Sequence, residues 1–178
     1  ARSLAQWFAP VESRMAVLAI AGASPLLYYA FVQPLMSHAL TFAFAALCVA
    51  FALRAERERS LAAWCLSGAC LGLAMLCRAQ AAPLVLFLLA GLWRSRAGWK
   101  AAFSAALAAF ILFLPQVAAW RLMYGSFFTI PQGSGFIDWK GRHAVDVLIS
   151  ADRGLFNWHP VLLLGLVGLL VALPVAKE

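Results

Sequence analysis

Long hydrophobic stretches separated by short charged breaks run along the whole chain. A helix needs about 20 apolar residues to cross the hydrocarbon core of a bilayer. The pattern predicts six spans, at residues 15–32, 36–53, 61–77, 81–93, 101–119 and 155–176, of which the third and the shorter fourth are a little short for a full crossing. A polar and aromatic segment at about 120–154 separates the last two. We therefore expect an all-α fold, a polytopic helical membrane bundle that forms one transmembrane domain over residues 1–178.

The basic residues orient this bundle, because Lys and Arg collect in short cytoplasmic loops. Nine lie on one side: Arg2, Arg14, Arg54, Arg57, Arg59, Arg94, Arg96, Lys100 and Lys177. Five lie on the other: Arg78, Arg121, Lys140, Arg142 and Arg153. This bias predicts that both ends of the chain are cytoplasmic and that the 120–154 segment is one long extracytoplasmic loop. The mixed-sign segment 54–59 is then expected to be a solvated loop that determines topology.

The composition also indicates that the predicted helices are surrounded by lipid. The chain is 65% hydrophobic and 12% charged, with a mean hydropathy of +0.87, whereas a soluble domain is about half apolar and a quarter charged. The net charge of +7 is explained by a cytoplasmic fringe that faces anionic headgroups, so nucleic acid is not expected as a partner. All four cysteines fall inside predicted spans, which argues against disulfides and metal ligation. No cofactor is indicated, although a divalent metal stays open.

Small residues mark one face of the third predicted span. Gly68 and Gly72 form a Gly-x-x-x-Gly pattern, which lets a neighbouring helix approach closely. That neighbour can belong to the same bundle or to a partner protein. Pro25, Pro83 and Pro115 each interrupt an apolar stretch and free backbone carbonyls that need other donors.

Candidate chemistry gathers on the predicted outward side. Arg78 lies in a hairpin tip of about three residues, where its side chain either reaches the interface or meets a phosphate or carboxylate. His38 begins the second span at the same level. The long loop and its borders hold the other candidates for binding substrate, Arg121, Arg153 and His159, and the three aspartates Asp138, Asp146 and Asp152. Asp152 beside Arg153 also fits a local ion pair or turn.

Two motifs, at residues 68–79 and 147–164, resemble the C-type membrane glycosyltransferases, specifically the bacterial relatives of the protein mannosyltransferases and the aminoarabinose transferases. Residues 68–79, Gly-Ala-Cys-Leu-Gly-Leu-Ala-Met-Leu-Cys-Arg-Ala, look like that family's small-residue helix, which ends in Lys or Arg. Residues 147–164 are similar to the outward loop that enters a late helix. Pro25 and the turn at 34–41 fall where a helix pair of the family would turn.

The resemblance implies a transferase of the bacterial cytoplasmic membrane that moves a sugar from a polyprenyl-phosphate carrier to an acceptor on the outer side. Arg78 would then lie near the carrier phosphate. The family's general base is an acidic residue in the first outward loop, which we expect to precede Ala1, so the chain is expected to be a fragment. Asp138, Asp146 and Asp152 are the acidic residues of the outward loop that could take the role of the base.

Two alternatives from other classes stay open. One is a fragment of a transporter or channel, in which Arg78 and His38 would line the passage. The other is a non-catalytic assembly subunit that binds a helix of its partner through Gly68 and Gly72.

Overall fold

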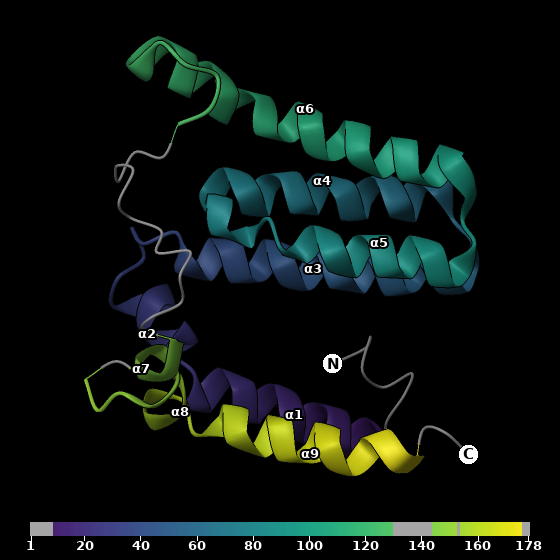
Figure 1. Cartoon of the computed structure of the whole chain (residues 1–178). Helices are drawn as coiled ribbons and strands as arrows, with labels where there is room; N and C mark the ends of the chain where they lie inside the picture. Colours follow the sequence, from purple (N-terminus) through teal and green to yellow (C-terminus); the bar gives the residue numbers. More distant parts are fainter. Residues whose placement is uncertain (1–8, 130–143, 153, 176–178) are drawn as a thin grey trace. The chain divides into compact units, whose positions relative to one another are not determined.

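The structure is a computed structural model that describes residues 9–129, 144–152 and 154–175, and every regular element among them is a helix (Figure 1). The elements are α1 (Pro10–Ala23), α2 (Leu26–Phe31), α3 (His38–Glu58), α4 (Leu61–Cys77), the 3₁₀ helix η2 (Ala79–Ala81), α5 (Leu84–Ser95), α6 (Gly98–Tyr124), α7 (Ala144–Ile149), α8 (Leu155–Trp158) and α9 (Val161–Val175). The predicted all-α class is confirmed for the described residues. The six crossings, their orientation and the single domain stay predictions.

The chain divides into two compact units, which are described separately. One unit combines Ser3–Tyr28 with Ile130–Glu178, and in it α1 packs against α9 while α8 contacts both α7 and α9. Pro25 ends α1, because proline disfavours helical backbone in the residue before it, and Ser24 is indeed extended at φ −109° and ψ 159°. The predicted span at 15–32 is therefore two helices, α1 and α2.

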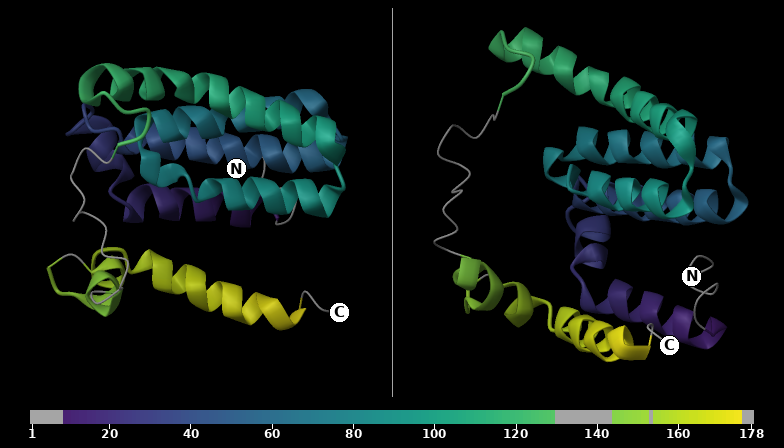
Figure 2. Two further views of the ribbon diagram at one scale, coloured as in Figure 1. Left: turned by 45° about the horizontal axis from the view of Figure 1, so that its top comes forward. Right: turned by 45° about the vertical axis from the view of Figure 1, so that its right-hand side comes forward.

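The other unit, Tyr29–Thr129, contains α3, α4, α5 and α6 (Figures 1 and 2). Short turns reverse the chain between successive helices, so α3 and α5 run antiparallel to α4, and α6 runs parallel to it. We call the end with the start of α3, the end of α4 and the end of α6 the Arg78 end. The opposite end, with the turns after α3 and α5, is the Arg59 end.

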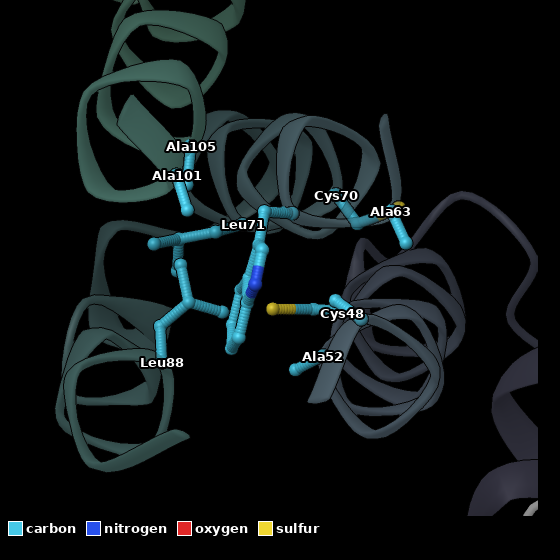
Figure 3. Packing of buried hydrophobic residues seen from close by; sticks show 10 residues of the cluster. Cys48, Ala52, Ala63, Cys70, Leu71, Leu88, Ala101 and Ala105 are labelled. Atoms are coloured by element: carbon cyan, nitrogen blue, oxygen red, sulfur yellow. The ribbon is translucent and has the colours of Figure 1, made fainter. Parts of the chain in front are cut away.

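Alanine and cysteine make up most of the hydrophobic core of this second unit, together with Trp64 and two leucines (Figure 3). The core cluster consists of the buried residues Cys48, Ala52, Ala55, Ala63, Trp64, Cys70, Leu71, Leu88, Ala101 and Ala105. Many large apolar side chains lie outside instead: Leu86 is 66% exposed and Phe110 is 59% exposed. Helices in lipid associate in this way, because the tails solvate large apolar groups as well as the protein interior does and small residues allow close backbone contact.

Two glycines set the distance between α4 and α6. A Cβ atom built on Gly68 would lie 2.6 Å from the Cα of Ala105, and one on Gly72 would lie 3.0 Å from the Cα of Ala109. The close approach that the Gly-x-x-x-Gly spacing predicts is therefore made between two helices of this chain. The helix α4 also contacts α3. The buried Ser67 hydroxyl of α4 donates a hydrogen bond to the Cys48 carbonyl of α3 at 2.7 Å.

Among the described residues, two helices, α3 with 21 residues and α6 with 27, are long and apolar enough to cross a membrane. The helix α4 and the segment Ala79–Ser95 are shorter apolar elements. Several helices extend beyond the predicted spans. The prediction of a loop at 54–59 is wrong, because α3 continues to Glu58, supported by an ion pair of 2.8 Å between Arg54 and Glu58 one helical turn apart.

The segment predicted as one long loop also contains helical residues. The helix α6 continues through Pro115 to Tyr124, where Gly125 ends it in a left-handed conformation with φ 71°. The short helices α7 and α8 follow the stretch 130–143, which lies outside the described residues. The sixth predicted span begins as α8 and continues, after a break at His159 and Pro160, as α9.

Candidate functional site at the Arg78 end

Arg78 ends α4, and the local sequence places it there. It is extended, with φ −153° and ψ 117°, and its N–H still donates to the Ala74 carbonyl at 2.9 Å. The single turn of η2 follows, and Pro83 then precedes α5, a position where the missing proline N–H costs no helical bond. Arg78 is thus held between two helices rather than on a long flexible loop.

His38 begins α3 and meets Arg78 across the antiparallel pair. The turn before it is closed by Met36 N–H donating to the Gln33 carbonyl at 3.1 Å, with Pro34 at the second turn position that proline favours. The Nη1 atom of Arg78 lies 2.8 Å from Nδ1 and 2.8 Å from Nε2 of His38. A guanidinium only donates hydrogen bonds and a neutral imidazole has one accepting nitrogen, so at most one of these two contacts is a hydrogen bond, and the tautomer decides which.

Tyr29 supports His38 from the other side of the turn. The two rings stack with centroids 4.3 Å apart and an interplanar angle of 28°. All three side chains, Tyr29, His38 and Arg78, are half-buried. The Tyr29 ring stacks on the His38 ring, and the His38 ring in turn contacts the Arg78 guanidinium. The sequence analysis did not single out Tyr29. Its nearest signal was an aromatic residue shortly before the Pro34 turn.

Arg78 has no acidic partner among the residues that the structure describes. Within the described parts of the chain, no carboxylate lies within 4.0 Å of its guanidinium. The ion pairs found there all lie at the Arg59 end and involve Arg54, Arg57, Arg94, Glu56 and Glu58. Arg78 therefore carries a half-buried positive charge with N–H donors beyond the one that faces His38.

Arg121 lies at the same end but not beside Arg78. Gly68 and Gly72 face Ala105 and Ala109, which makes Cys77 level with about residue 114, so Arg121 is about 10 Å further along the axis at 1.5 Å per residue. Its Nη1 donates to the Gly125 carbonyl, and its guanidinium lies 5.1 Å from the centre of the Phe127 ring. These contacts fix Arg121 at the end of its own helix.

Trp120 contributes a buried indole at this end. It is 5% exposed and meets the rings of Phe113 and Phe128 edge-on, with centroids 5.8 Å and 5.6 Å apart. Its Nε1 has no acceptor among the residues that the structure describes. The sequence analysis included Trp120 only in the polar and aromatic segment at about 120–154.

The remaining candidates fall in the unit with α7, α8 and α9 or outside the description. Asp146 and Asp152 are exposed, and the Asp152 N–H donates to the Ser150 hydroxyl at 3.3 Å. His159 ends α8, and its N–H donates to the Leu155 carbonyl at 3.0 Å. Asp138 and Arg153 lie outside the described residues.

That unit also holds a polar residue that the sequence analysis did not propose as a candidate. The Asn157 side chain donates to the carbonyls of Ile149 and Ser150 at 2.8 Å and 3.2 Å, which ties α8 to the end of α7. Across the described ranges, no group of three or more His, Cys, Asp or Glu side chains could hold a metal ion.

An apolar helical bundle whose core consists mostly of small residues belongs to the class of helical membrane proteins. The chain belongs to the dolichyl-phosphate-mannose-protein mannosyltransferase family, whose model matches residues 2–120. This match confirms the resemblance, and it supports a membrane glycosyltransferase of the mannosyltransferase type. His38 and Arg78 lie within the matched residues. No curated protein and no solved structure matches the sequence.

Proposed function

We propose that this chain is a membrane glycosyltransferase, or part of one, in which Arg78 binds the phosphate of a polyprenyl-phosphate-linked sugar. The observation that carries the proposal is the half-buried guanidinium with no carboxylate of the described residues within 4.0 Å and a neutral imidazole against it. The family match supports the reaction class. The charge bias along the sequence favours the outer side of a bacterial cytoplasmic membrane for this end.

The proposed chemistry uses Arg78 on the leaving group. When the acceptor oxygen attacks the anomeric carbon, the bond from that carbon to the phosphate oxygen breaks and its electron pair stays on the phosphate. A guanidinium bonded to that phosphate stabilises the growing negative charge. The acceptor hydroxyl loses its proton to a base. His38 is not assigned that role, because its contact with Arg78 already occupies a ring lone pair.

His38 and Tyr29 are assigned as positioning residues. The stacked rings restrict the imidazole, and the imidazole restricts the guanidinium. Without them, Arg78 could turn toward the headgroup region, as a basic residue at a helix end ordinarily does. The arrangement therefore holds the charge at a fixed place before the donor lipid arrives.

The test is sugar transfer by the full-length protein in proteoliposomes, with a polyprenyl-phosphate sugar as donor. Arg78→Ala should lower transfer by about tenfold to a hundredfold, because hydrogen bonds to charged groups contribute roughly 1.5–3 kcal/mol. Arg57→Gln, which removes an exposed cation at the opposite end, is the matched control and should stay within twofold. Arg78→Lys should recover only part of the loss, because an ammonium cannot bind phosphate in a bidentate manner.

The positioning role has its own readout. Tyr29→Leu removes the ring that stacks on His38 and should weaken binding of polyprenyl phosphate by about twofold to tenfold, whereas Tyr29→Phe keeps that ring. Unchanged transfer and unchanged phosphate binding in Arg78→Ala would refute the proposal. Arg78-dependent flux of a solute without any transfer would favour the transporter alternative.

A further inference from the structure

A cavity of about 530 Å³ opens at the Arg59 end, between the turns that follow α3 and α5. Four cationic side chains line it: Arg59, Arg94, Arg96 and Lys100. The buried residues Trp64 and Ala101 line it as well. Its volume falls within the range of about 300–1,000 Å³ that is usual for sites of small molecules.

The charges of this cavity are not balanced within the described part of the chain. Glu56 accepts from Arg94 Nη2 at 2.6 Å and 2.7 Å, which compensates one cation. Glu58 pairs instead with Arg54 and Arg57, which do not line the cavity. Arg59, Arg96 and Lys100 have no described carboxylate within 4.0 Å, so like charges crowd a concave surface that an anion would stabilise.

The backbone places two of these cations in an unusual conformation. Arg59 and Arg96 end α3 and α5 with φ 49° and 50°, and no other described residue except glycine has positive φ. Glycine is the usual residue at this position, because a side chain strains the left-handed backbone. Both strained positions therefore carry an arginine that lines the same cavity.

Aromatic side chains show the depth at which this cavity opens. Trp93 is 86% exposed and Trp99 is 73% exposed, on either side of the turn that carries Arg96. Exposed tryptophans at the ends of apolar helices lie at the membrane–water interface. These tryptophans favour headgroup level as the depth of the cavity, which opens beside the exposed apolar faces of α5 and α6.

We propose that this cavity binds the phosphodiester headgroup of an anionic phospholipid, with the acyl chains lying along α5 and α6. Guanidinium groups bind phosphate oxygens in pairs, and basic pockets between membrane helices take lipid headgroups. The site is separate from Arg78 and does not depend on the transferase proposal. It also gives Arg59, Arg96 and Lys100 a role beyond setting topology.

The test compares lipids on the purified full-length protein in detergent. Native mass spectrometry should show retained phosphatidylglycerol, and phosphatidylglycerol should raise the melting temperature more than phosphatidylcholine does. The double variant Arg96→Gln with Lys100→Gln should lower the apparent affinity for phosphatidylglycerol at least about tenfold. Arg54→Gln with Arg57→Gln, which removes two cations beside the cavity but not in it, should change the affinity less than twofold.

Arg96→Gly separates lost binding from lost folding. It removes a cation while relieving the left-handed backbone, so the variant should melt no lower than the wild type without lipid and still lose most of its response to phosphatidylglycerol. Equal losses in the two double variants would overturn the proposal in favour of diffuse attraction. If inorganic phosphate raised the melting temperature as much as phosphatidylglycerol does, the assignment of the cavity to a lipid would be overturned.

Discussion

Replacing Gly68 by alanine tests whether the contact between α4 and α6 holds the bundle together. The new Cβ would lie 2.6 Å from both the Cα and the carbonyl carbon of Ala105, whereas ordinary contact begins at 3.4 Å. The obstacle is backbone rather than a flexible side chain, so the two helices would have to separate by at least 0.8 Å, the difference between 3.4 and 2.6 Å.

The expected magnitude follows from two opposing effects. Alanine is the better helix former by up to about 1 kcal/mol, which favours the variant. Overpacking of a well-packed contact costs about 1–3 kcal/mol, and separating α4 from α6 also loosens dispersion contacts over the whole face. We therefore expect net destabilisation of about 1–2 kcal/mol, which corresponds to a melting temperature lower by roughly 2–8 °C for a protein of this size.

The chain provides both the assay and its control. Cys48 and Cys70 are buried in the same interior, at 0% and 7% exposure, so a dye that fluoresces on reacting with thiols reports its opening during heating. Gly165→Ala in α9 is the matched control, since a Cβ there meets nothing within 4 Å and the variant should melt at the same temperature or higher. Equal melting of the Gly68 variant and the wild type would refute the packing argument.

Two further predictions concern polar contacts of the same unit. Ser67→Ala loses the 2.7 Å hydrogen bond to the Cys48 carbonyl and should lower the stability by about 0.6–1.5 kcal/mol in the same melting assay. Ser104→Ala loses only a hydrogen bond within α6 and should lower the stability less. A larger loss in Ser104→Ala than in Ser67→Ala would contradict the assignment. Glu56→Gln weakens the pair with Arg94 and should cost about 0.2–1 kcal/mol at low salt and less at high salt, because Arg94 is 61% exposed. The same variant should strengthen binding of phosphatidylglycerol by freeing a cation in the cavity, and a weaker response would count against the lipid site.

The sequence predicted the helices best where capping residues mark their ends. Residues 61–77 were predicted as a span, and α4 has the same bounds, because Ser60 accepts from the Ala63 N–H at 3.2 Å at one end and Arg78 ends the helix at the other. Hydropathy alone failed where charged residues continue a helix, as in the last turn of α3. Polarity marks where lipid ends, not where the helix ends.

The candidate site was predictable only in part. The hairpin geometry of two successive spans puts His38 and Arg78 at one level, and the structure places them in contact. The position of Tyr29 depends on the directions in which the chain leaves the breaks at Pro25 and Pro34. The hydrophobic periodicity of the sequence does not specify those directions. The cavity at the Arg59 end was not predicted, since it arises where turns that are distant in the sequence meet in three dimensions.

Basic residues at helix ends are expected in any membrane bundle. A binding residue therefore differs from a topology signal in its surroundings, that is, in whether water or a carboxylate of the chain compensates its charge. Arg54 and Arg57 are more than half exposed and share Glu58, as side chains that serve orientation alone would. Arg78 is half-buried and packed on a neutral ring, and it has no described carboxylate within ion-pair distance. Burying a cation without an anion costs free energy, and a restricted side chain cannot recover it by turning into water. An anion that arrives from outside the chain can recover it, and this is the role that we propose for the phosphate of the donor lipid.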